Sequence, residues 1–152
     1  GGNAGPSLVP ADIIVDPASS LSFGYSVASA GDVNGDGLPD LVVGAGLGDS
    51  AHVFLNSPEG IIPEPVQSWS VPGAWFGFSV ASAGDVNGDG YGDLGIPQQG
   101  TGVYLFHGPI TTHTDVTMAS DGFPDSWTIS QQVSLLGQGA SEITRVQRLP
   151  EP

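Results

Sequence analysis

The feature that constrains this chain most is a string of twelve residues, SVASAGDVNGDG, that occurs twice. It spans residues 26–37 and residues 79–90, an offset of 53, and the similarity extends from Phe23–Leu41 to Phe76–Leu94. An identity of this length in a chain of 152 residues does not arise by chance. Two copies of one structural unit are therefore present, and the fold is expected to be built by repetition of that unit.

Within each copy, short apolar runs alternate with turn-forming residues, a pattern that predicts short strands. Gly accounts for 24 of the 152 residues and Pro for 13, which excludes a helical bundle or a coiled coil and suits strands joined by tight turns. Four strands in about 50 residues are the size of one propeller blade. The expected strands cover 23–30, 41–45, 51–55 and 68–71 in the first copy, and 76–83, 94–96 and 102–106 in the second.

Weaker signals flank the two copies. Ser126–Ile129 is similar to Ser68–Val71, and Leu136-Gly137 stands where a further Phe-Gly pair is expected, so a degenerate third copy is predicted. Ile13–Val15 is predicted to be the outer strand of a preceding blade. We therefore expect one region over 1–152, with repeat 1 at about 23–75, repeat 2 at about 76–130 and a degenerate third repeat at about 131–152.

The candidate functional residues lie in an acidic loop with the pattern Asp-x-Asn-x-Asp-Gly-x-x-Asp, present once in each copy. Oxygen side chains at positions 1, 3 and 5 can converge on one point because the glycine at position 6 permits a sharp turn. A backbone carbonyl at position 7 and the aspartate at position 9 would complete an all-oxygen shell, which suits Ca²⁺ better than Zn²⁺, Cu²⁺ or Mg²⁺. The sequence thus predicts two Ca²⁺ sites, with ligands Asp32, Asn34, Asp36, Leu38 (carbonyl) and Asp40, and Asp85, Asn87, Asp89, Tyr91 (carbonyl) and Asp93.

Three other structures with similar loops fit this sequence less well. Asn-Gly and Asp-Gly are common hairpin turns, but a turn does not require four oxygen side chains at alternating positions. An EF-hand requires an acid at position 12, where this chain has Val43 and Ile96. A dockerin requires a helix after the loop, whereas the residues after Asp40 are strand-like and contain a glycine.

Residues 23–45 and 76–97 resemble an FG-GAP repeat, as found in the β-propellers of integrin α-subunits. The second copy has Gly95-Ile96-Pro97 in place of the family's Gly-Ala-Pro. The resemblance implies a Ca²⁺-binding loop between the first two strands of each blade, held by the ligands named above. Propellers of this family usually close with seven blades, whereas 152 residues supply fewer than three. The predicted fold is therefore all-β, with two full blades and partial flanking blades of an incomplete propeller or of a larger one.

Three arrangements would resolve the missing blades: a fragment of a longer chain, subunits that complete a ring together, or docking onto another protein. The fragment is favoured. The chain opens at Gly1-Gly2 without an initiator Met, and we expect a processed or excised product.

Charge excludes two classes of partner. The net charge is −14, there is no Lys, and the basic residues are Arg145 and Arg148. Nucleic acids and anionic membranes are bound mainly through basic side chains, so neither is an expected partner. The chain has no Cys and no apolar run of about 18 residues, so no disulfide, thiolate site or membrane-spanning segment is expected. Aspartates make up 12 of the 16 acids, and two bound Ca²⁺ would bring the charge from −14 to −10.

No catalytic constellation is recognisable, and we predict that the protein is not an enzyme. His107 and His113, with Asp115 nearby, could form a cluster, but their spacing matches no known metal or acid–base motif. The segment Asp121–Asp125 imitates half of the acidic loop and is interpreted as a turn. Trp69 and the corresponding Trp127 are interpreted as core residues.

The sequence therefore favours a calcium-binding, extracellular FG-GAP module that acts in non-catalytic binding or adhesion, with a protein or carbohydrate ligand. One alternative is a structural subunit of a surface or extracellular assembly that completes its propeller with other chains, as a homo- or hetero-oligomer. Another is the accessory propeller of a secreted enzyme such as a polysaccharide lyase. Millimolar calcium outside the cytoplasm indicates an extracellular, cell-surface or periplasmic location.

Overall fold

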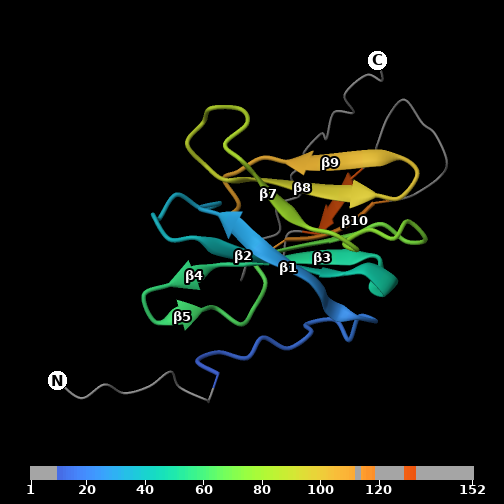
Figure 1. The fold of residues 1–152 in the computed structure, drawn as a ribbon, viewed down its shortest axis with the longest axis horizontal. Coiled ribbons are helices and arrows are strands. Elements are labelled where there is room, and N and C mark those ends of the chain that lie inside the picture. Colours follow the sequence, from blue (N-terminus) through green and yellow to red (C-terminus); the bar gives the residue numbers. More distant parts are fainter. Residues whose placement is uncertain (1–9, 112–113, 119–128, 133–152) are drawn as a thin grey trace.

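A computed structural model describes residues 10–111, 114–118 and 129–132 of the chain, and they form strands in three sheets (Figure 1). The largest sheet has the order β1-β2-β3-β6-β10-β11, a small hairpin pairs β4 with β5, and the third sheet has the order β7-β8-β9. Among these residues no helix is long and apolar enough to cross a membrane. The elements are β1 (Phe23–Gly31), β2 (Asp40–Ala45), the short 3₁₀ helix η1 (Gly46–Gly48), β3 (Ser50–Phe54), β4 (Asn56–Ser57), β5 (Gly60–Ile61), β6 (Gln67–Ser70), β7 (Ala81–Gly84), β8 (Asp93–Gln98), β9 (Gly102–Phe106), β10 (Thr114–Met118) and β11 (Ile129–Gln132).

The first repeat is a four-stranded antiparallel sheet, as the sequence predicted. Strands β1, β2, β3 and β6 follow one another as neighbours, which is the arrangement of a propeller blade. Val42 and Val53 are fully buried opposite each other on β2 and β3, whereas Val27 on β1 is exposed. The hairpin β4–β5, inserted before β6, was not predicted.

The second repeat shows three antiparallel strands, β7, β8 and β9. Strands β8 and β9 lie at the predicted places, whereas β7 begins only at Ala81, because the chain turns over residues 76–79 that were predicted as strand. The segment Ser126–Ile129, which is similar to Ser68–Val71, lies mostly outside the described residues. Strand β10 instead lies parallel to β6, with Thr114 opposite Gln67, an arrangement that the sequence did not indicate. The described sheets do not close into a ring, so the architecture is that of an incomplete set of propeller blades.

The strand predicted at Ile13–Val15 is wrong. This segment has no strand assignment, and Ile13 and Val15 are 74% and 68% exposed. A β-strand needs a neighbour to satisfy its backbone N–H and C=O groups, and no described strand pairs with this segment.

The two repeats meet through glycines. Gly77, with φ +79°, lies so close to β3 that an added Cβ would collide with the backbone oxygen of Ser50. A Cβ on Gly44 would likewise collide with the backbone oxygen of Gly77, which accepts a 2.9 Å hydrogen bond from Ser26 Oγ. The neighbouring Phe76 is fully buried. The Phe-Gly pair of the second repeat thus brings its backbone against β2 and β3 of the first.

The end of β8 in the second repeat differs from the end of β2 in the first, as the strand register shows. Pro97 pairs with Val103 just as Gly44 pairs with Ala51, so Pro97 is the structural counterpart of Gly44. A proline ring takes the place of a glycine that has no room for a Cβ in the first repeat. The second blade therefore lacks the small residue through which the first blade receives the next Phe-Gly pair.

Candidate metal centre

The two acidic loops occupy the same place in their sheets. The first connects β1 to β2 and the second connects β7 to β8, so each joins the first two strands of a blade. They lie side by side at one end of the molecule, at the upper left of Figure 1, because Gly92 N–H donates a 2.7 Å hydrogen bond to the backbone oxygen of Asp32. No helix follows either loop, which agrees with the exclusion of helical calcium modules.

The first loop is organised around the carboxylate of Asp32. Its Oδ1 accepts hydrogen bonds from the backbone N–H groups of Gly35 (2.6 Å) and Asp36 (3.1 Å). Its Oδ2 accepts a hydrogen bond from the N–H of Gly37 (2.8 Å). Gly35 and Gly37 have φ of +83° and +86°, a conformation that glycine adopts without strain. The loop therefore closes around the side chain at position 1.

Asn34 and Asp36 add a second set of contacts. Asn34 Oδ1 accepts the N–H of Asp36 at 3.0 Å, and Asn34 Nδ2 donates to Asp36 Oδ2 at 2.9 Å. The other carboxylate oxygen of Asp36 accepts the N–H of Leu38 at 2.8 Å. Three oxygen-bearing side chains at alternating positions are thus held on one short turn.

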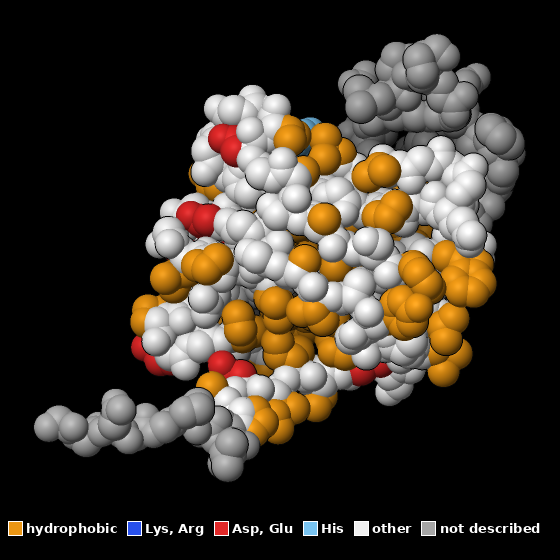
Figure 2. All heavy atoms as spheres, viewed as in Figure 1, with side chains coloured by type: hydrophobic (Ala, Val, Ile, Leu, Met, Phe, Trp, Pro, Cys, Tyr) orange, Lys and Arg blue, Asp and Glu red, His pale blue; other side chains and the backbone are white. Residues whose placement is uncertain are grey.

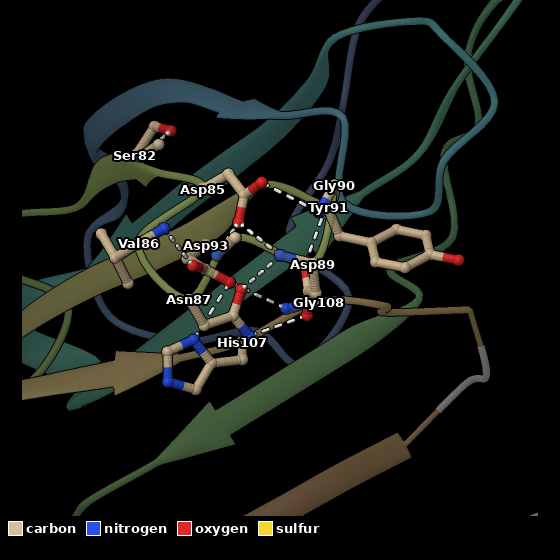
Figure 3. A network of polar contacts seen from close by, with 12 residues as sticks. Ser82, Asp85, Val86, Asn87, Asp89, Gly90, Tyr91, Asp93, His107 and Gly108 are labelled. Carbon is tan, nitrogen blue, oxygen red and sulfur yellow. Dashed lines mark hydrogen bonds and ion pairs between the residues drawn. The ribbon is translucent and has the colours of Figure 1, made fainter.

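The second loop repeats this network (Figure 3). Asp85 accepts N–H groups from Gly88 (2.7 Å), Asp89 (3.0 Å) and Gly90 (2.8 Å). The contacts at positions 3, 5 and 7 recur as well, through Asn87, Asp89 and Tyr91. Because the two loops have different surroundings, the shared conformation is a property of the repeated sequence itself.

Position 9 differs from the others, since both aspartates are buried and directed at backbone groups. Asp40, only 2% exposed, accepts the N–H of Val33 at 2.9 Å and the N–H of Asn56 at 2.8 Å. It therefore ties the loop to the segment that follows β3. Burial raises the pKa of Asp40, and the charges of Asp36 and Asp32 raise it further, against the two backbone hydrogen bonds.

Asp93 is the counterpart of Asp40 and has one more partner. It is fully buried and accepts the N–H of Val86 at 2.7 Å and of Gly108 at 3.1 Å, and it pairs with His107 Nδ1 at 3.2 Å. Burial acts to raise the pKa of Asp93, but the two backbone hydrogen bonds and His107 outweigh it, so the pKa is lowered. His107 therefore contacts the second loop, whereas its expected neighbours His113 and the side chain of Asp115 lie outside the described residues.

The donor set of each loop fits a hard cation in its chemistry: carboxylates, one amide oxygen and a backbone carbonyl, with no sulfur or nitrogen ligand. In the described part of the chain, however, no three acidic or histidine side chains converge closely enough to hold a metal ion. The carboxylates at positions 1, 5 and 9 accept backbone N–H groups instead. Each ionised carboxylate has about four acceptor positions, so these contacts do not use up its capacity. The ten ligands stay a prediction.

A cluster of exposed aromatic rings lies at the other end of the blades and was not predicted. The ring of Phe78 is 4.4 Å from that of Tyr25 and 5.8 Å from that of Trp75. These side chains are 42%, 53% and 48% exposed. Asp49 fixes the turn beneath them, because its carboxylate accepts the N–H groups of the three residues Gly73, Ala74 and Trp75.

Two further aromatic or histidine side chains, Trp69 and His52, are buried inside the first blade. Trp69 is 6% exposed and stacks on Phe106, which confirms it as a core residue, while Trp127 lies outside the described residues. His52 is buried, with Ser50 Oγ 3.2 Å from its Nε2 and Ser68 Oγ 2.9 Å from its Nδ1. The segment 121–125 is likewise outside the described residues.

The contrast between Asp93 and Asp40 gives a prediction for the calcium-free protein. At neutral pH, Asp93→Asn is expected to cost about 1.5–3 kcal/mol, because a hydrogen bond to a charged group is lost and an amide N–H₂ then faces an N–H donor. Asp40→Asn is expected to cost less, since the charge of Asp40 is already disfavoured by burial and by two nearby acids.

Urea unfolding measures both costs. The lowered pKa of Asp93 means that its charge stabilises the fold above the ordinary value of 3.8 and that this stability is lost as pH falls through the folded-state value. The difference between Asp93→Asn and the parent should therefore shrink at about pH 3. An equal cost for the two variants at neutral pH would contradict the prediction.

Stacked antiparallel blades, each with an acidic loop between its first two strands, define a class of protein: repeats of the β-propeller type. Residues 32–96 match the FG-GAP-like repeat family, which confirms the FG-GAP resemblance of the sequence over that part of the chain.

The chain is similar to integrin α chains. It is 39% identical to integrin alpha-7 of Homo sapiens over 115 residues, which cover 66% of this chain and 10% of that protein. It is 37% identical to integrin alpha-PS2 of Drosophila melanogaster over 110 residues, covering 57% of this chain and 8% of the relative. Similarity to integrin alpha-IIb of Mus musculus reaches 39% over 80 residues, or 47% of this chain and 8% of the relative. The chain thus spans about a tenth of the length of these relatives.

Proposed function

We propose that this chain is a calcium-binding FG-GAP module that acts in non-catalytic binding or adhesion outside the cytoplasm. The observation that carries the proposal is the acidic loop itself, present twice in the same conformation with the same internal hydrogen bonds. A turn alone would not need three carboxylates. The described residues contain no Lys or Arg to compensate them.

In each loop the side chains at positions 1, 3, 5 and 9 and the carbonyl at position 7 would hold the ion. Bound Ca²⁺ would supply positive charge where the acids now repel one another, a repulsion that contributes to the raised pKa of Asp40. The loop joins the first two strands of a blade, so the ion would fix the connection between them. Extracellular calcium is high enough to fill sites of moderate affinity.

The aromatic cluster supports the binding part of the proposal. Tyr25, Trp75 and Phe78 expose about half of their surfaces and lie at the end of the blades opposite the acidic loops. Exposed aromatic rings are enriched where proteins bind partners, because they bury a large area on contact. Figure 2 shows hydrophobic side chains across the centre and the right of the face, and acidic ones toward the left and the lower edge.

The proposal is tested by native mass spectrometry of the full chain in CaCl₂ and after EDTA treatment. We expect two additional Ca²⁺ ions per chain in CaCl₂ and none after chelation. No retained calcium in CaCl₂ would contradict the calcium part of the proposal.

The binding surface is tested with an array of immobilised matrix proteins and glycans. The double variant Trp75→Ala with Phe78→Ala is expected to lose at least about tenfold in affinity for whatever the parent binds, because a hot-spot residue contributes about 2 kcal/mol or more. The same variant should retain its calcium in native mass spectrometry. Undiminished binding would remove the aromatic cluster from the proposed surface.

A structural subunit that completes its propeller with other chains is the second candidate. All four residues of β7 are exposed, so this strand presents a surface that no described residue covers. Such a subunit would form a closed oligomer in the same native spectra. A monomer at micromolar concentration would favour the binding module instead.

A further inference from the structure

The two acidic loops stop being identical at positions 7 and 8. After the shared glycine, the first loop continues with Leu38-Pro39 and the second with Tyr91-Gly92. In the structure, Tyr91 and Gly92 are the residues through which the second loop contacts the first. The divergence therefore falls at the contact between the loops.

Gly92 makes a contact that Pro39, its counterpart, could not make. Its N–H donates a 2.7 Å hydrogen bond to the backbone oxygen of Asp32, the first residue of the other loop, and proline has no N–H. A Cβ on Gly92 would lie 2.9 Å from the backbone oxygen of Ala30 and 3.1 Å from the nitrogen of Asp32. Position 92 thus needs both an N–H group and the absence of a side chain.

Tyr91 leaves its own loop and covers the other. Its ring points away from Asp85 and Asp89 in Figure 3, and a Cβ on Gly35 would lie 2.6 Å from the ring carbon Cε1. The counterpart of Gly35, Gly88, has open space on the same side.

The loops also differ in their valines. Val33 in the first loop is fully buried, whereas Val86 in the second is 52% exposed. The backbone oxygen of Val33 accepts the N–H of Ile110, so the segment after β9 packs on the first loop together with Tyr91 and Gly92, while no described residue covers Val86 of the second loop in the same way.

One peptide group connects the two candidate metal sites. The carbonyl of Tyr91 is the predicted ligand at position 7 of the second loop, and the N–H of Gly92 belongs to the same planar unit. A cation on that carbonyl would polarise the peptide and strengthen the hydrogen bond from Gly92 N–H to the backbone oxygen of Asp32.

We propose that Tyr91 and Gly92 are positioning residues for the first loop, and that calcium binding at the two loops is positively coupled through their shared peptide group. This inference rests on the proposed function, because the coupling acts between calcium sites. The positioning part acts on the loop itself and is expected without calcium as well.

The test is a calcium titration of the full chain with NMR as the readout. The amide signals of Gly35 and Gly37 report binding at the first loop, and those of Gly88 and Gly90 report binding at the second. With Asp89→Asn in the second loop, the calcium affinity of the first loop is expected to fall by about fivefold or more. Thermodynamic linkage then requires that disabling the first loop with Asp36→Asn lowers the affinity of the second by the same factor.

The variant Tyr91→Leu tests the ring separately from the peptide group. It introduces the residue that the first loop has at this position, Leu38, and it keeps the carbonyl of residue 91 and the N–H of Gly92. We expect faster amide hydrogen exchange at Gly35 and Gly37, in EDTA as well as in CaCl₂, because the cover over Gly35 is lost. Tyr91→Phe should keep the slow exchange of the parent, because the contact with Gly35 is made by ring carbons.

The outcomes distinguish the two proposals. Two loops that each bind calcium, with each variant affecting its own loop alone, would overturn the coupling and leave the proposed function standing. Unchanged exchange at Gly35 and Gly37 in Tyr91→Leu would overturn the positioning role. A parent chain that binds no calcium would overturn the proposed function and the coupling together, while faster exchange in EDTA would still support the positioning role.

Discussion

Replacing Gly77 by alanine is expected to cost about 3 kcal/mol or more and to loosen the second blade from the first. Two physical terms contribute. A φ of +79° is unfavourable for any residue with a Cβ, at about 1–2 kcal/mol. The new methyl group would also collide with the backbone oxygen of Ser50, and forced overpacking costs about a further 1–3 kcal/mol. Because small domains are stable by only about 5–15 kcal/mol, this is a large fraction of the total.

Gly24→Ala is the matched control for this prediction. Gly24 is the glycine of the Phe-Gly pair in the first repeat and has φ +84°, but nothing lies within 4 Å of its Cβ position. It should therefore show the cost of the conformation without the collision. Urea unfolding of both variants measures the difference. If Gly77→Ala were no more destabilising than Gly24→Ala, the close approach of the blades would not contribute to stability.

The same pair of glycines shows how far the sequence could predict the fold. The twelve-residue identity and the alternation of apolar runs predicted β1, β2, β3 and β6 of the first blade and β8 and β9 of the second, because strand pairing inside a blade is local in sequence. They could not predict that Gly24 faces open space and Gly77 faces Ser50, since that depends on which blade precedes each motif. The strand prediction for Ile13–Val15 was wrong for a related reason, because residues of high β-propensity form a strand only where a neighbouring strand can pair with them.

For the candidate site, the local sequence pattern predicted the turn of each acidic loop, while tertiary contacts decided the surroundings of the individual side chains. The turn around Asp32 follows from glycines and short polar side chains within the loop, so it could be predicted. The burial of Asp40 could not, since its partner Asn56 lies on a hairpin 16 residues further along. Asp49 carried no sequence signal either, because the three N–H groups that it holds belong to the turn before the second repeat.

The second large effect is expected for Asp36→Asn, whose sign should depend on calcium. In EDTA the variant should be as stable as the parent or more stable, since it removes a charge that raises the pKa of buried Asp40. The amide retains an oxygen that can accept the N–H of Leu38. The hydrogen bond from Asn34 Nδ2 is lost, but this group is exposed and can donate to water instead, so the turn should persist. In CaCl₂ the variant should be the less stable protein, because a carboxylate ligand is lost.

The size of the calcium effect follows from linkage. A ligand that binds only the folded state stabilises it by about 2.7 kcal/mol at a free concentration 100 times Kd, so losing one site forfeits up to this amount. Thermal unfolding in CaCl₂ and in EDTA measures both signs. Glu64→Gln removes the same charge at an exposed position outside the loops, and its effect should be the same in both buffers. Only a bound cation makes the charge of Asp36 favourable in CaCl₂ and unfavourable in EDTA. If the effect of Asp36→Asn were the same in both buffers, as expected for Glu64→Gln, the acids of the first loop would stabilise the turn and would not bind calcium.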